Sequence, residues 1–440
     1  MASSRSIADR NTHDLTIVVR ARLEVETTKQ EIAVQPKRRI FTAALLAGAF
    51  LSPIVHAADA KPIRIGVIGP VTGKNSEDMG QSIIGAARVF LSDVNQIGGI
   101  MGHPVEIIER DDQANPDRGV AIAKEMVEQK VAAVVGFGNT GVALPAAKVL
   151  QEAKIPVIVS GATGAIVTKS FMPPAYPASY VFRTSASDAI QPIVILNDLI
   201  DKRKIDRIAL IHDESPYGTN GKASLLAEFD KRGLKPAAVE SFKVGDADLS
   251  AQLRRIKESG AQAMVLYCLA GDAANIVKTA AGLQMHQAIV GPWTLSQDSF
   301  INKAGGAAEG ARTVVTFIEN DASSSSSQFT LAYRKLNKVT RIPSAVAAAQ
   351  TYDALRLLAL AMYQANSTDG VQVQHALENL DQHTTSTVIT RYFKPYSAAD
   401  HEAISLNMAV MGEIRNGKVI YAYKEDENRS TIARTKAPSK

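Results

Sequence analysis

Apolar positions in this chain follow two rhythms that alternate from residue 61 onward. Short continuous apolar runs are typical of buried parallel strands, and longer stretches with an apolar residue every three or four positions are typical of helices. The strand-like runs are 63–69, 105–110, 132–136 and 156–159, and the helix-like stretches between them are 78–94, 116–129 and 144–153. This alternation predicts a parallel, doubly wound α/β sheet.

The same alternation then restarts and predicts a second α/β unit of similar size. Its expected strands are 207–212, 238–242, 263–268 and 288–291, and its expected helices are 188–201, 218–232, 251–259 and 273–281. Helical patterns follow at 328–339, 345–363 and 370–380. A last pair of strands, 406–414 and 419–423, is separated by Asn416-Gly417, which is a strong hairpin-turn signal.

The N-terminal segment has the layout of a secretory signal. Lys37-Arg38-Arg39 precedes an apolar stretch over 40–55, and Val55-His56-Ala57 offers the small residues that signal peptidase cleaves after. The alternative is a membrane anchor, but 40–55 is short for a hydrocarbon core of about 30 Å. We therefore expect 1–57 to be an extension plus a cleaved signal, and the mature chain to be secreted without membrane insertion.

Charge and cysteine content narrow the function classes. The chain has 440 residues, with Lys+Arg 49 against Asp+Glu 44 and a formal net charge of +5. Without 1–57 the balance is 41 against 39, so most of the basic excess belongs to the export segment and nucleic acid is not an expected partner. The single cysteine, Cys268, excludes an intrachain disulfide and a cysteine-based metal site.

Motifs that carry catalysis are missing from the sequence. The segment 69–74 resembles a phosphate loop, but only three residues separate its glycines and Asn75 replaces the required hydroxyl. Asp111-Asp112 would point to opposite faces of a strand, which disfavours a metal pair. His212-Asp213-Glu214 could be acid–base machinery, although a strand entering a polar loop is the favoured interpretation. We expect no enzyme activity, no cofactor and no metal.

Six short segments are specific through their order and spacing, although each alone is a weak signal. They are 63–70 with Thr72-Gly73, 98–106, 160–163, 182–184, 211–213 with Tyr217-Gly218, and 307–310. Together they resemble the periplasmic solute-binding proteins of the branched-chain amino acid ABC transporters, the leucine/isoleucine/valine-binding type. The resemblance extends over nearly the whole mature chain.

The resemblance implies a type I periplasmic binding fold, in which two Rossmann-like lobes are joined by three hinge crossovers. Lobe one would contain 59–184 and 318–385, lobe two 185–317 and 386–423, and 424–440 would be a charged tail. The ligand would lie in the interlobe cleft, at the carboxyl ends of the strands, and the lobes would close on it. It also implies a periplasmic monomer that delivers a small carboxylate to ABC permease subunits. The alternative is a ligand-sensing module of the same fold.

Two loops are expected to hold the ligand carboxylate. Asn139 and Thr140 follow the third strand, where relatives use small polar side chains. Gly161, Ala162 and Thr163 follow the fourth strand and offer backbone N–H groups and a hydroxyl. Amides at a strand–helix junction form a ready anion site. The alternative role for Thr163 is a helix cap.

The remaining candidates leave the ligand class open. Tyr217 lies where relatives place an aromatic residue of lobe two, although it could be a surface-turn tyrosine. Relatives that bind amino acids place a glutamate after the 263–268 strand to pair with the ammonium. Here Asp272 either stands in for it or is a helix cap, in which case the ligand is an aromatic or aliphatic acid without an amine. Met79 is a pocket wall or helix core.

Overall fold

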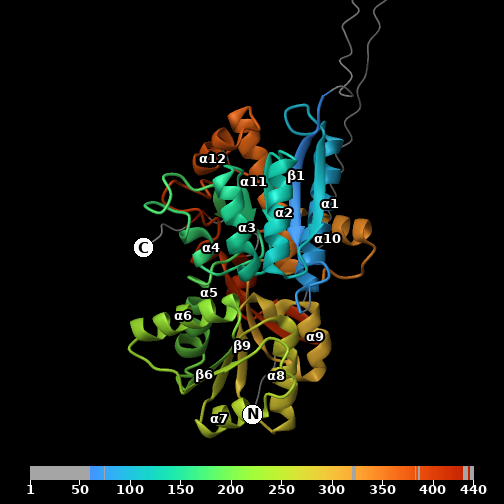
Figure 1. Cartoon of the computed structure of the whole chain (residues 1–440). Helices are drawn as coiled ribbons and strands as arrows, with labels where there is room; N and C mark the ends of the chain where they lie inside the picture. Colours follow the sequence, from blue (N-terminus) through green and yellow to red (C-terminus); the bar gives the residue numbers. More distant parts are fainter. Residues whose placement is uncertain are drawn as a thin grey trace, which may run out of the picture. The chain divides into compact units, whose positions relative to one another are not determined.

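Two separate β-sheets share the part of the chain that the structure describes. This computed structural model describes residues 60–73, 75–319, 324–381, 383–384, 387–429 and 435–436. The expected signal over 1–57 lies outside these residues. Each sheet forms the centre of one lobe, and both lobes belong to one structural unit (Figure 1).

The first sheet is parallel throughout and has the order β2-β1-β3-β4-β5. Its strands are β1 (Ile63–Gly69), β2 (Val105–Asp111), β3 (Ala133–Gly136), β4 (Val157–Val159) and β5 (Val181–Arg183). Because successive side chains point to opposite faces, Ile65 and Val67 face one helical layer and Val134 and Val159 face the other.

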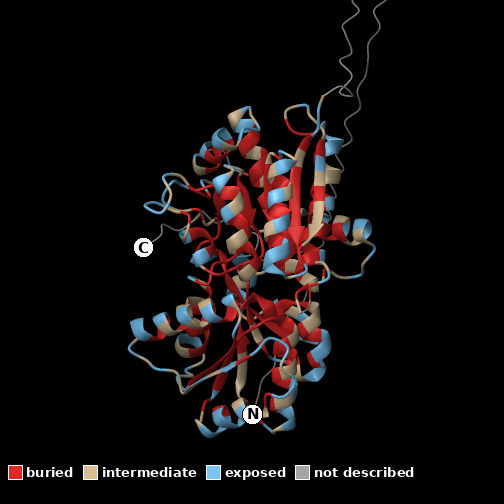
Figure 2. Ribbon diagram, in the orientation of Figure 1, coloured by how far each residue is buried: buried red, intermediate tan, exposed pale blue. Residues whose placement is uncertain are grey.

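Helices cover both faces of the first sheet. The Ile65 face packs against α1 (Glu77–Gln96), α10 (Ser324–Asn337), α11 (Ala345–Ala365) and α12 (Gly370–Glu378). The other face packs against α2 (Pro116–Glu128), α3 (Thr140–Glu152) and the short α4 (Ile166–Lys169). Figure 2 shows the buried strands between helices whose outer faces are exposed, which explains the continuous apolar runs in the sequence.

The second sheet has the order β12-β11-β10-β9-β8-β6-β7. Its strands are β6 (Ile208–Asp213), β7 (Ala238–Phe242), β8 (Ala263–Tyr267), β9 (Ala288–Gly291), β10 (Arg312–Val315), β11 (Val410–Arg415) and β12 (Lys418–Tyr421). Pairing is parallel from β7 to β10 and antiparallel for β10–β11 and β11–β12. The hairpin expected at Asn416-Gly417 is therefore the outer edge of this sheet.

Helices also cover both faces of the second sheet. One face packs against α5 (Gln191–Leu196) and α6 (Pro216–Lys231), and the other against α7 (Ser250–Glu258), α8 (Ala270–Gly282) and α9 (Asp298–Ala304). The helix expected over 188–201 is divided into α5 and a π-helical turn, Asn197–Lys202. The strand expected from 406 begins with a 3₁₀ turn, Leu406–Met408, and becomes β11 only at Val410.

The chain crosses between the lobes three times, after β5, after β10 and before β11. The last crossover comes later than the expected boundary at 385/386. Val388, Tyr392 and Tyr396 are buried in the core of lobe one, and Glu402 bridges to Arg183 at the end of β5. Burial of these aromatic rings keeps the segment with lobe one until Met408, so its assignment to lobe two was wrong.

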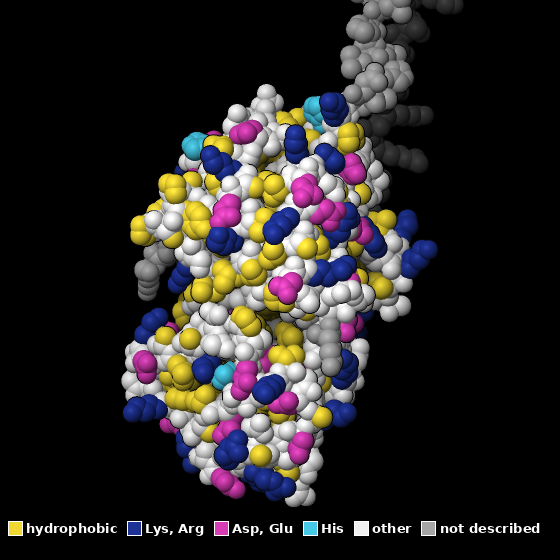
Figure 3. All heavy atoms as spheres, viewed as in Figure 1, with side chains coloured by type: hydrophobic (Ala, Val, Ile, Leu, Met, Phe, Trp, Pro, Cys, Tyr) yellow, Lys and Arg dark blue, Asp and Glu magenta, His cyan; other side chains and the backbone are white. Residues whose placement is uncertain are grey.

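The expected tail is partly ordered into structure. Residues Lys424–Arg429 form α13, and the Lys436 ammonium lies 2.8 Å from an oxygen of Asp400. On the face drawn in Figure 3, positive and negative side chains are interspersed and do not separate into fields of one sign. Among the described helices, none combines the length and apolar character that a membrane crossing requires.

Candidate functional site

A small cavity lies where the carboxyl ends of strands from both lobes meet. Lobe one contributes Met79, Gly138, Asn139, Thr140, Gly161 and Thr163, and lobe two contributes Tyr217, Leu269, Trp293 and Thr294. The space left between them is about 10 Å³, which is room for a single water molecule. Six of the residues expected from the sequence line this cavity together. The other two, Ala162 and Asp272, do not line it.

Asn139 and Thr140 line the cavity on the side of lobe one, and both form hydrogen bonds to neighbouring loops of that lobe. Helix α3 begins at Thr140, four residues earlier than the sequence pattern predicts, so Asn139 is its extended N-cap. The Asn139 side-chain Nδ2 donates to Ser76 Oγ at 3.0 Å, and its Oδ1 has no partner among the described residues. The Thr140 hydroxyl accepts the Gly164 N–H at 3.2 Å, which joins the loops after β3 and β4.

Gly161 allows these two loops to pack against each other. A Cβ at this position would lie 2.9 Å from both Gly138 Cα and Phe137 O, which no ordinary side chain can do. The expected close approach therefore exists, but the partner is protein backbone. The neighbouring Ala162 N–H donates to Phe137 O at 2.9 Å, so this amide is used inside the protein and Ala162 lies outside the cavity wall.

Thr163 forms a hydrogen bond to a buried carboxylate, Asp188, which the sequence pattern did not predict. Its hydroxyl donates to Asp188 Oδ2 at 3.2 Å, and the Tyr267 hydroxyl donates to Asp188 Oδ1 at 3.1 Å. Burial raises the pKa of Asp188 to about 7, and the nearby Arg183 charge opposes that rise. Thr163 is not the cap of α4, because Ala165 occupies that position. A lone aspartate in a polar crossover carries no periodicity signal, so only the fold reveals Asp188.

Arg183 stabilises the lobe-one wall of the cavity through buried contacts with the residues around Thr163. Its side chain is fully buried and forms a bidentate pair with Glu402, with Nε–Oε2 at 2.7 Å and Nη2–Oε1 at 2.5 Å. Nη1 also donates to Gly164 O at 2.8 Å, and Nη2 donates to Ser187 Oγ at 2.8 Å. One guanidinium thus ties the loop after β4 to the first crossover and to the segment around Glu402.

The wall of lobe two is aromatic. Tyr217 is the second residue of α6 and only 6% exposed, so it is not a surface-turn tyrosine. Its ring centroid is 5.7 Å from that of Tyr267, and its hydroxyl lies beside the Thr294 hydroxyl. Trp293 lies two residues after the end of β9 and is 2% exposed. Leu269, Trp293 and Thr294 were missed, although the rule that ligands bind at strand ends points to the residues after β8 and β9.

Asp272 and Met79 have different environments from those expected. Asp272 Oδ1 accepts from Asn75 Nδ2 of lobe one at 3.2 Å and from Gly245 N at 3.1 Å, so this carboxylate bridges the lobes beside the cavity. Met79 is buried and packs with Tyr217 and Trp293 of lobe two while it lines the cavity. Both residues contact the opposite lobe, which sequence periodicity could not predict.

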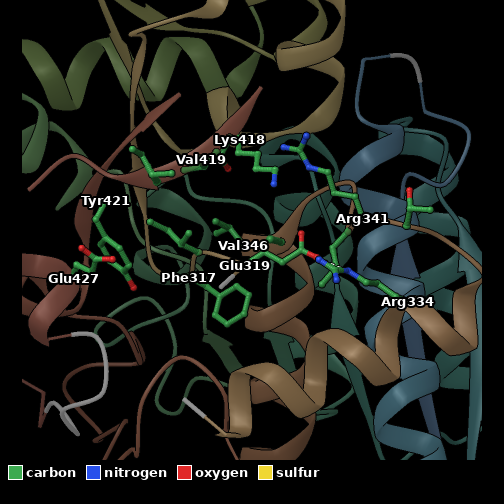
Figure 4. Close-up of a pocket in the computed structure, with 15 residues that line it drawn as sticks. Phe317, Glu319, Arg334, Arg341, Val346, Lys418, Val419, Tyr421 and Glu427 are labelled. Carbon is green, nitrogen blue, oxygen red and sulfur yellow. Dashed lines mark hydrogen bonds and ion pairs between the residues drawn. The ribbon is translucent and has the colours of Figure 1, made fainter. Parts of the chain in front are cut away.

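A larger pocket of about 370 Å³ lies between α10, α11 and β12 (Figure 4). Both of its arginines already have anionic partners. Arg334 Nε lies 2.8 Å from Glu319 Oε1, and Arg341 Nε lies 2.7 Å from Asp298 Oδ1. Within the described chain, none of the buried side-chain atoms lining this pocket lacks a partner. The interlobe cavity has four such atoms: Asn139 Oδ1, Tyr217 OH, Trp293 Nε1 and Thr294 Oγ1.

The chemistry of the interlobe cavity is that of neutral dipoles. Its described lining carries no charged side chain, no histidine and no cysteine. The described residues also contain no group of three or more His, Cys, Asp or Glu side chains placed to hold a metal ion. Hydroxyl, amide and indole groups can orient a ligand, but this lining offers no acid–base pair for a reaction. The arrangement is suited to reversible binding.

Comparison with known proteins gives consistent matches. The family profile described as periplasmic binding protein matches residues 62–418. An "amino acid binding protein" of Pseudomonas aeruginosa is 30% identical over 55% of this chain and 63% of its own length, somewhat less than two thirds. "Leu/Ile/Val-binding protein homolog 3" of Brucella melitensis is 27% identical over 73% of this chain and 84% of its own length.

Solved structures show the same architecture. The branched-chain amino acid transporter substrate binding protein LivJ from Streptococcus pneumoniae, in complex with isoleucine, superposes with a TM-score of 0.71 at 24% identity, over 82% of this chain and 98% of LivJ. A solute binding protein of an ABC transporter from Rhodopseudomonas palustris, in complex with 3,4-dihydroxybenzoic acid, gives a TM-score of 0.67 at 23% identity, over 82% and 95%. The two-lobed α/β fold expected from the sequence is confirmed.

Proposed function

Because the chain belongs to the periplasmic binding protein family, a family of solute-binding proteins rather than enzymes, we propose that it captures a small carboxylate between its lobes and delivers it to the permease subunits of an ABC importer. The protein would act in the periplasm as a monomer after loss of its signal peptide. The observation that carries this proposal is the interlobe cavity, whose wall combines strand ends of both lobes and buried polar atoms without partners.

The carboxylate end of the ligand would lie against lobe one. Helix α3 has 13 residues and begins at the cavity with Thr140. The positive end of its dipole and its first-turn amides favour an anion without the cost of burying a cation. The Thr140 hydroxyl, whose oxygen accepts the Gly164 N–H, still has a proton to donate to the carboxylate. Asn139 and Thr163 complete this wall from the two adjoining loops and are held there by Ser76 and Asp188. Gly161 contributes by letting these loops pack together, so the site is assembled before the ligand arrives.

The rest of the ligand would lie against lobe two. Tyr217, Leu269 and Trp293 supply apolar and aromatic surface there, and Met79 adds apolar surface from lobe one. This lining suits the body of an amino acid or of an aromatic or aliphatic acid. Relatives named for leucine, isoleucine and valine support the first class, and the fold neighbour with 3,4-dihydroxybenzoic acid illustrates the second.

Capture requires a hinge motion. A cavity of about 10 Å³ is far smaller than any such ligand, so the lobes would separate to admit it. The three crossovers provide the hinge. Gln350 connects two of them, because its backbone oxygen accepts from Thr184 Oγ1 at 3.0 Å and its Nε2 donates to Thr316 Oγ1 at 3.1 Å. The bridge between Asn75 and Asp272 would form on closure.

A thermal-shift screen tests the proposal. Purified mature protein would be mixed with leucine, isoleucine, phenylalanine, benzoate and hexanoate, and with the matching amides, which lack the carboxylate. A ligand at 100 times its Kd adds about 2.7 kcal/mol to the free energy of unfolding, so a true ligand should clearly raise Tm. The amide of that ligand should have little effect.

The matched variants use two threonines. Thr163→Val should reduce the ligand-induced shift, whereas Thr219→Val, on the exposed surface of α6, should keep it. If no carboxylate raised Tm, or if the amides were as effective as the acids, the proposed function would be rejected.

A further inference from the structure

The wall of lobe two contains polar atoms that the protein itself leaves without partners. Trp293 Nε1, Tyr217 OH and Thr294 Oγ1 are all buried. Trp293 Nε1 has no partner within the described chain, and the two hydroxyls have none there besides each other. The two hydroxyls lie beside each other. All three residues line the cavity, and they come from two different segments, the start of α6 after β6 and the 3₁₀ turn after β9.

Buried polar atoms of this kind are costly unless something completes them. A buried donor without an acceptor destabilises the folded state, and native proteins contain few of them. Trp293 Nε1 is a donor only, so it requires an acceptor. The Tyr217 and Thr294 hydroxyls can each donate and accept a hydrogen bond. They can therefore bind a ligand group that also does both, such as a hydroxyl.

The surroundings determine the charge that this group can carry. The lining of the cavity has no carboxylate, and the residue before α8 that faces it is Leu269. Asp272, three residues further on, is engaged by Asn75 and Gly245 outside the cavity wall. An ammonium group at this end of the ligand would be buried without an opposite charge, which is unfavourable. A neutral oxygen can form hydrogen bonds with the same three polar atoms without the cost of burying an unpaired charge.

We propose that the ligand carries, at the end opposite its carboxylate, an uncharged oxygen-bearing group such as a hydroxyl, which accepts the indole N–H of Trp293 and contacts the Tyr217 and Thr294 hydroxyls. This inference rests on the proposed function, because it takes the carboxylate-binding cavity as given. It identifies the ligand class as a hydroxylated or oxo-substituted carboxylic acid. Selectivity for the polar group would come from lobe two.

The chain provides its own reporter, because Trp293 is its only tryptophan. In ¹⁵N-labelled mature protein, the indole N–H therefore gives a single, assigned cross-peak. The probes are benzoate and its 2-, 3- and 4-hydroxy derivatives, together with phenylalanine and tyrosine. We expect at least one hydroxylated probe to bind at least tenfold more tightly than its parent by calorimetry. That probe should also move the indole proton downfield and slow its exchange with solvent.

Variants separate a direct hydrogen bond from general packing. Trp293→Phe keeps an aromatic ring and removes the N–H, so the affinity ratio between the hydroxylated probe and its parent should collapse toward one. Tyr217→Phe should reduce this ratio less, because Thr294 remains. If parent acids bound as tightly as every hydroxylated probe, or if the indole signal ignored all bound probes, the inference would be wrong while the proposed function stood. Failure of every carboxylate to bind would reject both.

Discussion

The two walls of the cavity are built on different principles. Lobe one presents loops whose polar groups are mostly satisfied within the protein: Thr140 by Gly164, Thr163 by Asp188, and the Asn139 amide in part by Ser76. Lobe two presents two large aromatic side chains. Within the described chain, Trp293 Nε1 has no partner, and the Tyr217 hydroxyl has only the neighbouring Thr294 hydroxyl. One wall is therefore preorganised, whereas the other is incomplete until something lies against it.

This difference suggests a division of labour. A preorganised wall can bind the carboxylate of the proposed ligand, because its geometry does not depend on the rest of the ligand molecule. The incomplete wall of lobe two can discriminate between ligands. A ligand that leaves the polar atoms of this wall without hydrogen bonds binds more weakly, because those atoms lose their contact with water and gain nothing in return. Lobe one would recognise the class of ligand and lobe two would recognise the individual member.

The largest expected effect follows from removing the support of the preorganised wall. Arg183→Leu leaves the Glu402 carboxylate without its guanidinium and frees Gly164 O, so the free energy of unfolding should fall by about 3 kcal/mol. Urea denaturation measures this loss. Glu402→Gln should cost less, because Glu402 is partly exposed and its amide can still accept one hydrogen bond. A change within about 0.5 kcal/mol for Arg183→Leu would show that the wall does not depend on this pair.

An intermediate effect should follow from Thr163→Val, which keeps the side-chain shape and removes the hydroxyl. Affinity should fall about tenfold for every carboxylate probe, hydroxylated or not, and stability should fall by about 1 kcal/mol because Asp188 loses a donor. Calorimetry with benzoate and a hydroxybenzoate measures both ratios. A loss confined to the hydroxylated probe would contradict the assignment of Thr163 to the shared, carboxylate-binding wall.

The last expected effect is a pH dependence of stability that originates behind the same wall. The pKa of Asp188 is raised by burial from 3.8 to about 7, so between these values the folded protein holds a proton that the unfolded chain has released. Stability should therefore fall as pH rises through this window, and it should level off above it.

The variant that isolates this contribution is Asp188→Asn. Asp353, whose pKa burial also raises to about 7, contributes a slope of the same sign, so the variant should show a smaller difference between pH 5 and pH 8 and not a flat profile. Urea denaturation at the two pH values gives the comparison. An unchanged difference would mean that Asp188 does not titrate in this range.

The sequence pattern predicted most of the elements because the strands of both sheets are covered by helices. Buried strands such as β1 and β8 appear as uninterrupted apolar runs. Pro116, in the first turn of α2, indicates the start of that helix. Predictions were weaker where packing overrides local preference. The segment around Tyr392 and Tyr396 has little periodicity, and it stays with lobe one because its rings fill that core.

The lining of the interlobe cavity could be predicted to the extent that it follows strand ends. Asn139, Thr140, Gly161 and Thr163 lie directly after β3 and β4, so their convergence could be expected from the parallel topology. Trp293 and Leu269 obey the same rule in lobe two but carry no motif that would select them. Asp188 could not be found, because its partners Thr163 and Tyr267 are 25 and 79 residues away.

The sequence by itself determined the family, the two-lobed α/β architecture and the loops that face the cleft, because these follow from local periodicity and from short ordered motifs. The tertiary structure alone decided which atoms of those loops remain available. It placed Ala162 and Asp272 outside the cavity wall, connected Thr163 to Asp188, and left the Trp293 N–H without a partner. Hydrogen-bond satisfaction depends on contacts between residues distant in the chain, and a pattern along one sequence does not contain them.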